Sequence, residues 1–132
     1  MNSNDRRPAI IGIDGGGTKV IAGIIEKHQD VFYLNKFSSN RYYLENPDFD
    51  IGFSPVSMGN QLRELKANEI KPTTAEIAQS KPIINSFRDV ILELKINSPV
   101  LIGIGMVGLK TSDNRGIGAI ANGPRMPKFC AH

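Results

Sequence analysis

The sequence predicts an α/β domain whose mixed sheet has three antiparallel strands, a crossover helix and a parallel central strand. Apolar, β-branched runs at 10–13, 20–25 and 31–37 are separated by short glycine-rich or polar turns, as in a meander. An amphipathic stretch with a helical apolar stripe begins near Ser80. The continuous apolar run at 100–106 then predicts a parallel strand that is buried on both faces.

The turn after the first strand has an unusual composition, since residues 10–19 read I-I-G-I-D-G-G-G-T-K. Glycines let the backbone approach an oxyanion and take up positive φ, so that successive N–H groups point into one concavity. Thr18 and Lys19 would add further donors, and Asp14 would face the metal ion that accompanies nucleotide phosphates. The turn is therefore predicted to bind phosphate, although a plain hairpin turn would also use glycines.

Two better-known phosphate motifs are disfavoured. Gly12–Lys19 nearly matches G-x-x-x-x-G-K-[ST], but its last two residues are reversed and residues 20–25 predict a strand where that loop needs a helix. Residues 103–108 formally match G-x-G-x-x-G. A dinucleotide site also needs a helix and a later acidic residue, whereas 109–116 is rich in turn residues and no acid follows Asp113.

The middle of the chain is less regular. A polar turn that contains His28, interpreted as an exposed loop histidine, joins the second strand to the third. Residues 38–59 are turn-rich but contain aromatics, which indicates an insertion partly packed on the domain. It is either a lid or oligomer contact or, as we favour, a long loop with its own small cluster. A short helix is expected at 61–67, and residues 72–76 have a Thr-x-x-Glu-like start of another turn.

The clearest helix begins near Ser80, with Pro82 in its first turn, and ends before Asn97. Its apolar stripe consists of Ile83, Ile84, Phe87, Val90, Ile91 and Leu94. We expect a core helix across the sheet, followed by a right-handed crossover that places the 100–106 strand beside the first strand. Residues 117–121 would form an edge strand.

A family resemblance adds to this interpretation. The glycine turn resembles the phosphate-1 motif of the actin, heat-shock-70 and sugar-kinase superfamily, and it is especially similar to ROK sugar kinases and to N-acetylglucosamine-kinase and activator-ATPase relatives. Residues 103–111 and 115–127 are similar to the ROK segment in which a G-x-P-G turn precedes a strand and a sugar loop. Val107 stands where the family has proline, and the loop at 122–127 does not align residue for residue.

The resemblance implies a ribonuclease-H-like, actin-like ATPase lobe that uses ATP and Mg²⁺ to phosphorylate a sugar hydroxyl. The cofactor-binding residues that it implies are Asp14, which would also bind the metal, and Gly15, Gly16, Gly17, Thr18 and Lys19. The sugar-binding residues would be Gly105, Gly108, Asn122 and Gly123. The family places its catalytic aspartate beyond the matching region, so the catalytic residue is unknown, and Asp113 is interpreted as a turn residue.

The chain of 132 residues is long enough for one domain with a core. We expect a disordered tail at 1–8 and an N-terminal lobe at 9–132 with an irregular insertion at about 38–75. We expect these residues not to include the second lobe of such kinases. The isolated chain is therefore expected to be inactive and to self-associate or to need a C-terminal lobe. The alternative is a non-catalytic nucleotide-binding or regulatory module of the same superfamily.

Composition is that of an ordinary cytoplasmic domain, with 40% apolar and 22% charged residues. No apolar stretch approaches the roughly 20 residues that cross a bilayer, and the polar start lacks a signal-peptide core. Cys130 is the single cysteine, as expected in a reducing compartment. The net charge of +3 is spread along the chain, so a nucleic-acid partner is not expected. The lack of a long apolar stretch likewise argues against a membrane partner.

Overall fold

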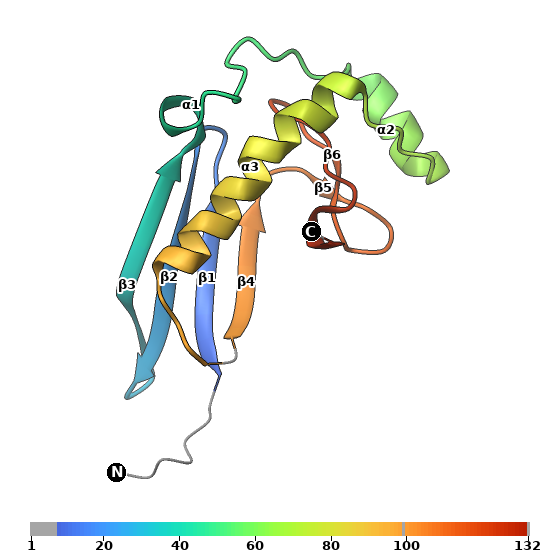
Figure 1. Cartoon of the computed structure of the whole chain (residues 1–132). Helices are drawn as coiled ribbons and strands as arrows, with labels where there is room; N and C mark the ends of the chain where they lie inside the picture. Colours follow the sequence, from blue (N-terminus) through green and yellow to red (C-terminus); the bar gives the residue numbers. More distant parts are fainter. Residues whose placement is uncertain (1–7, 99, 132) are drawn as a thin grey trace.

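The computed structural model describes residues 8–98 and 100–131, and it contains a four-stranded mixed sheet (Figure 1). The strands are β1 (Ala9–Gly15), β2 (Lys19–His28), β3 (Val31–Arg41) and β4 (Val100–Met106), in the order β3-β2-β1-β4. β1 and β3 are antiparallel to β2, whereas β4 is parallel to β1. The predicted α/β class, the meander and the parallel pairing of the first and fourth strands are confirmed.

Three helices follow the meander before β4. They are α1 (Tyr42–Glu45), α2 (Met58–Ala67) and α3 (Thr74–Glu93). The prediction that the long helix begins near Ser80, with Pro82 in its first turn, is wrong. A capping box starts α3 six residues earlier: Thr73 Oγ1 accepts from the Glu76 amide at 3.1 Å, and Glu76 Oε1 accepts from the Thr73 amide at 3.0 Å. Pro82 is buried inside the helix.

The core lies between α3 and one face of the sheet. The predicted apolar stripe supplies Ile83, Phe87, Val90 and Leu94, and the strands supply Ile11, Ile13, Val20 and Ala22. On the sheet, Ile11, Ile13 and the facing Ala22 alternate with residues of the opposite face, as the pleat requires. The expectation of a core helix lying across the sheet is confirmed.

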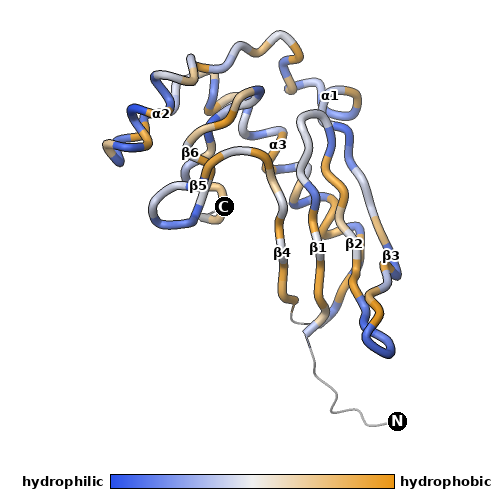
Figure 2. The backbone as a smooth tube through the Cα atoms, turned by 180° about the vertical axis from the view of Figure 1, so that it is seen from behind, coloured by the Kyte–Doolittle hydropathy of each residue, from blue (hydrophilic) through white to orange (hydrophobic). Residues whose placement is uncertain are grey.

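The prediction that β4 is a central strand, buried on both faces, is wrong. Within the described part of the chain β4 is the edge of the sheet, and the side chains of Leu101, Ile102 and Ile104 are 59%, 41% and 42% exposed. The helix α3 packs mainly over β2 and β3. Apolar side chains in an edge strand remain exposed where no other layer covers them. Figure 2 shows β4 as a hydrophobic strand at the edge of the sheet.

The C-terminal part forms a second, smaller sheet. β5 (Leu109–Lys110) pairs antiparallel with β6 (Ile117–Ala119), and a short 3₁₀ helix follows at Phe129–Ala131. Residues 117–121 therefore do not provide the edge strand that was predicted for the main sheet. This small sheet lies next to α2, beyond the end of β4 (Figure 1).

The region at 38–75 is only partly irregular. It contains the end of β3, α1 and α2, and its loops are residues 46–57 and 68–73. The short helix predicted at 61–67 is confirmed and begins three residues earlier. Among the residues described, no helix is long and apolar enough to cross a membrane.

Candidate functional site

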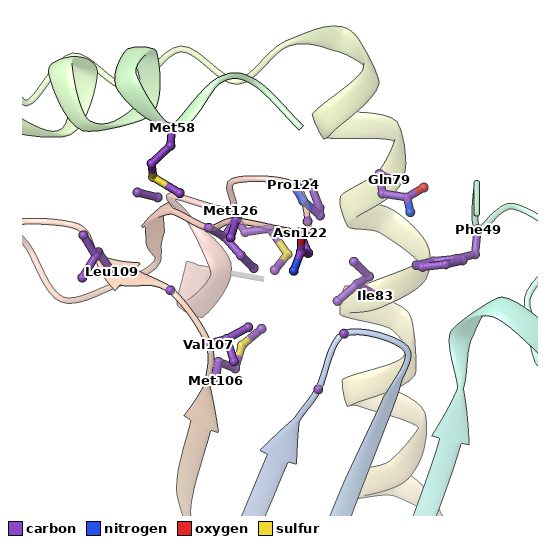
Figure 3. Close-up of a pocket in the computed structure, with 17 residues that line it drawn as sticks. Phe49, Met58, Gln79, Ile83, Met106, Val107, Leu109, Asn122, Pro124 and Met126 are labelled. Atoms are coloured by element: carbon purple, nitrogen blue, oxygen red, sulfur yellow. The ribbon is translucent and has the colours of Figure 1, made fainter. Parts of the chain in front are cut away.

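A cavity of about 540 Å³ lies where the β1–β2 turn meets the segments that follow β4 and β6 (Figure 3). It brings together two sequence motifs that are far apart in the chain. The predicted site residues Gly16 and Gly17 line it on one side, and Gly108, Asn122 and Gly123 line it on the other. The other lining residues are Phe49, Met58, Gln79, Ile83, Met106, Val107, Leu109, Ala119, Ile120, Ala121, Pro124 and Met126.

The remaining predicted site residues lie outside this lining. Asp14 is exposed at the end of β1, and Thr18 and Lys19 are exposed beyond the loop glycines. Gly15 is buried beneath α3. Gly105 borders a neighbouring groove of about 400 Å³ along the free edge of β4. The cavity lining therefore includes only some of the predicted cofactor-binding residues and some of the predicted sugar-binding residues.

The β1–β2 turn is tight. The Gly16 amide donates to the Lys19 carbonyl at 2.9 Å, directly after the last ladder pair, Gly15 with Val20. The expectation that these glycines take up positive φ is wrong, because Gly108, at 115°, is the one glycine with positive φ in the described chain. The amides of Gly17 and Thr18 make no hydrogen bond to any described residue. They remain available to an oxyanion.

Of the glycines at this turn, Gly15 is explained by its small size and not by an unusual dihedral angle. A Cβ atom on Gly15 would lie 2.5 Å from Phe87 Cζ and 3.0 Å from Met106 Cγ. A Cβ atom on Gly17 would meet nothing within 4 Å, because this residue borders the open cavity. Gly15 is thus required by packing, whereas packing does not require a glycine at position 17.

Tyr42 holds the glycine turn in place from the end of β3. Its amide donates to the Thr18 carbonyl at 3.0 Å, and its hydroxyl donates to the Gly16 carbonyl at 3.3 Å. The side chain is 1% exposed and stacks at a tilt on Phe49, with ring centroids 5.6 Å apart. Burial, and then the negative charge of Asp14, raise the pKa of Tyr42. The hydroxyl therefore stays protonated and remains a donor.

Asp14 is the carboxylate nearest to the predicted phosphate site by sequence. Among the described residues no group of three His, Cys, Asp or Glu side chains could by itself hold a metal ion. A magnesium ion on a nucleotide needs fewer protein ligands, because it is bound by one or two carboxylates together with phosphate oxygens and water. Asp14 precedes the free amide of Gly17 by three residues, and a single carboxylate of this kind is compatible with Mg²⁺ that arrives with a nucleotide.

The loop that carries Asn122 and Gly123 is anchored by a buried ion pair. Arg125 is 1% exposed, and it donates to Glu76 from its amide, Nε and Nη2 at 2.8, 2.9 and 2.7 Å. Arg125 also contacts a second carboxylate, that of Glu64, whose Oε2 lies 3.0 Å from Arg125 Nη1. Burial would raise the pKa of Glu76, but the hydrogen bonds from Arg125 and Thr73 outweigh it and lower that pKa.

The buried side-chain amide of Gln61 fixes Ile120, which lies two residues before Asn122 in the same segment. Gln61 of α2 is fully buried; its Oε1 accepts from the Ile120 amide at 2.7 Å, and its Nε2 donates to the Ile120 carbonyl at 3.1 Å. The side chain thus pairs with the backbone as a neighbouring strand would. Together with Arg125, it fixes both ends of the segment that lines the cavity.

Asp113 lies in a turn, as its sequence setting predicts. Its Oδ1 accepts from Thr111 Oγ1 at 2.6 Å and from the Arg115 amide at 3.0 Å. These two hydrogen bonds lower the pKa of its carboxyl. The residue does not line the cavity. Its role in the structure is therefore that of a turn acceptor.

Several lining residues were not identified from the sequence. Phe49 and Met58 belong to the region interpreted as a long loop, and no periodic pattern connects them with the glycine turn. Gln79 precedes the predicted start of the helix, and Ile83 is predicted for its core stripe, whereas in the structure the two residues lie one helical turn apart on α3. Gln79 also ties the insertion to the helix, because its side-chain amide exchanges two hydrogen bonds with the Asp50 backbone.

No family model matches the chain, and neither a curated protein nor a solved structure matches it significantly. The function is therefore argued from the cavity, from the hydrogen bonds around it and from the motif resemblance. The lining residues are uncharged, so the polar groups at the cavity are the free backbone amide of Gly17 and the side chain of Asn122.

Proposed function

We propose that this chain is the phosphate-binding lobe of an ATP-dependent sugar kinase with a ribonuclease-H-like, actin-like ATPase fold. One observation carries the proposal. The glycine turn that resembles a phosphate-1 motif and the segment that resembles a ROK sugar loop line the same cavity. Nothing in the spacing of the two motifs along the chain requires this.

The free amides support phosphate binding. Gly17 borders the cavity and, like Thr18, has an amide without a hydrogen-bond acceptor among the described residues. Phosphoryl transfer depends on positioning and on neutralising charge, and it asks for little covalent chemistry from the protein. Asp14 would hold the magnesium ion, and the two amides and Thr18 would position the β- and γ-phosphates.

The opposite wall supports a hydroxylated acceptor. Asn122 is exposed within the lining and makes no hydrogen bond to the described chain, so its amide is free to bind a sugar hydroxyl. Gly108, with φ of 115°, turns the chain directly after β4, where a Cβ atom would lie 2.7 Å from the Ala119 carbonyl oxygen. Gly105, by contrast, would act only by shaping the end of β4.

The strand order supports the proposed fold. Three antiparallel strands, a crossover through a helix and a fourth strand parallel to the first give the order β3-β2-β1-β4, which agrees with the fold that the superfamily resemblance implies. The free, apolar edge of β4 is where a further strand of a larger sheet would pair. We therefore propose that a C-terminal lobe or a second chain completes the molecule, in the cytoplasm where ATP is available.

A second candidate function is a non-catalytic nucleotide-binding or regulatory module. The observation in its favour is that no carboxylate or histidine lines the cavity, so no general base faces an acceptor there. In the kinase proposal that base comes from the second lobe. Sequence beyond residue 132 that carries an aspartate on a strand and another glycine loop would favour the kinase.

Nucleotide binding tests the shared part of both candidates. We expect Mg-ATP to raise the melting temperature of the chain, because a ligand that binds only the folded state stabilises it. The effect should fall when Mg²⁺ is replaced by a chelator and when Asp14 is replaced by alanine. Glu26→Ala, a change to another carboxylate of the same sheet far from the cavity, is the control. An unchanged melting temperature at millimolar Mg-ATP would reject both candidates.

A further inference from the structure

A second cavity, which we call the lysine pocket, lies apart from the one at the glycine turn. It has a volume of about 490 Å³ and is formed by the segment before α3, the first half of that helix and residues 125–129. Of the residues described, only Met126 belongs to the lining of both cavities. The lysine pocket is therefore a separate place where a ligand could bind.

The two cavities lie on opposite sides of α3. Ile77, Lys81 and Ile84 line the lysine pocket, and their spacing of four and three residues puts them on one side of the helix. Gln79 and Ile83 line the first cavity and lie on the other side. A ligand in the lysine pocket would not occupy the site of the proposed phosphoryl transfer.

The wall of the lysine pocket is apolar and incompletely covered. Its apolar side chains outside α3 come from the segment before the helix and from the C-terminal segment, and all of them are half-buried. The apolar wall consists of Ile70, Pro72, Ile77, Ile84, Pro127 and Phe129. Single exposed apolar residues are ordinary, but several that surround one hollow are typical of a binding site.

The polar side chains in the buried part of the lining already have partners. Ser80 Oγ donates to the Glu76 carbonyl at 2.6 Å. The guanidinium of Arg125 donates to the Glu76 carboxylate from Nε and Nη2, and its Nη1 lies 3.0 Å from Glu64 Oε2. A ligand rich in hydroxyl groups would lose hydrogen bonds to water there, which costs free energy. The interior therefore suits a hydrocarbon group.

Two lysines give the rim of the pocket a positive charge. Lys81 on α3 and Lys128 on the C-terminal segment are exposed in its lining, and no acidic residue lines it. Neither lysine forms an ion pair with a described residue. The charge of Arg125, by contrast, is balanced by the carboxylates of Glu76 and Glu64. The rim is therefore complementary to an anion.

We propose that the lysine pocket binds an amphiphilic carboxylate, such as a medium-chain fatty acid. The carboxylate would lie at the rim with Lys81 and Lys128, and the alkyl chain would pack against Ile77, Ile84 and Phe129. The volume of the pocket is within the range of small-molecule sites. This binding needs neither the glycine turn nor a nucleotide, so it is an activity beyond the proposed function and is tested independently of it.

Isoleucine methyl groups report on both cavities. In a chain labelled with ¹³C at the isoleucine δ1 methyls, octanoate should shift the signals of Ile70, Ile77 and Ile84 and not that of Ile120, which lines the first cavity. Octylamine should need a concentration at least about tenfold higher, because the lysines attract one head group and repel the other. Equal concentrations for the two compounds, no shift at millimolar octanoate, or shifts centred on Ile120 would overturn the proposal.

Two pairs of lysine variants test the carboxylate site. Lys81→Gln combined with Lys128→Gln should weaken octanoate binding about fivefold or more and leave the binding of 1-octanol unchanged. Lys66→Gln combined with Lys110→Gln is the control, because it removes the same charge at two exposed lysines outside the lining. Equal effects of the two double variants would show that only the overall charge attracts octanoate and would reject the assigned rim.

A pair of variants on α3 tests the site of the alkyl chain. Ile77→Gln should weaken the binding of both octanoate and 1-octanol several-fold, as read from the methyls of Ile70 and Ile84. Leu92→Gln is the control, because Leu92 is an exposed apolar residue of the same helix, at 66% against 52% for Ile77, and does not line the pocket. Binding that Ile77→Gln leaves as strong as Leu92→Gln does would contradict the proposed pocket.

Discussion

Arg125 and Glu76 are joined through three nitrogen donors and both carboxylate oxygens, and both side chains are almost completely buried. The same carboxylate accepts from the Thr73 amide and so completes the capping box of α3. One glutamate thus fixes the start of the long helix and the loop that lines the cavity. The position of that loop depends on where the helix begins.

Removing Arg125 should destabilise the fold strongly. Arg125→Leu leaves the Glu76 carboxylate buried without its partner, which typically costs about 3–5 kcal/mol. Urea unfolding of the variant and of Lys128→Leu, an exposed neighbour, would measure the difference. A loss below about 1 kcal/mol would mean that water replaces the guanidinium at little cost.

Stability should fall in acid, partly because of Glu76. Its pKa in the folded state lies below the ordinary value of 4.5, so the stabilisation is complete above that value and is lost as the pH falls through the folded pKa. Unfolding free energies between about pH 3 and pH 7 should therefore fall more steeply in the wild type than in Glu76→Gln. Parallel curves would show that Glu76 has the same pKa in both states. Glu64 is the carboxylate expected to differ between the two proteins, because it also contacts Arg125 and the charge of Glu76 raises its pKa.

Gly15 and Gly17 should respond differently to alanine: the first change should destabilise the fold and the second should not. Gly15→Ala places a Cβ atom against Phe87 and Met106, and overpacking of this kind costs about 1–3 kcal/mol. Gly17→Ala meets open space at a residue without positive φ, so its stability should change by less than about 1 kcal/mol. The same methyl group should weaken nucleotide binding, since it borders the cavity. Thermal unfolding of both variants, with and without Mg-ADP, checks the pattern, and unweakened binding by Gly17→Ala would count against a phosphate at this turn.

Tyr42→Phe should loosen the glycine turn while the fold persists. The variant loses the hydrogen bond to the Gly16 carbonyl and keeps the backbone bond to Thr18, so we expect a loss of about 0.5–1.5 kcal/mol. Amide hydrogen exchange at Gly16 should become faster, because its amide closes the turn with Lys19. Tyr43→Phe, in the exposed neighbour, is the matched control. Equal exchange in the two variants would show that the hydroxyl does not hold the turn.

The meander and the parallel fourth strand could be predicted because each strand carries a local signal, namely a β-branched run bounded by turn residues. The start of α3 was misplaced because Pro82 is favoured in a first turn, and the capping box at Thr73 was assigned to a separate element. The carboxylate of Glu76 in that capping box also binds Arg125. This contact joins residues far apart in the chain, and spacing in the sequence cannot reveal it.

The cavity was predictable at its two ends but not along its apolar wall. Gly17 and Asn122 were identified through motifs, whereas Met58 and Phe49 lie in a region without periodicity and reach the cavity only through folding of the insertion. The prediction that β4 is buried on both faces is wrong because an apolar run shows only which side chains the strand carries. Whether other elements cover it depends on the rest of the fold.

Backbone amide chemical shifts during a titration with Mg-ADP test the central claim most directly. The account predicts shifts centred on Gly17 and Thr18 that extend across the cavity to Gly108 and Asn122, and that weaken in Asp14→Ala and Gly17→Ala. Shifts that are absent at millimolar nucleotide, or that lie elsewhere on the chain and persist in both variants, would contradict it and leave the glycine turn as a packed hairpin.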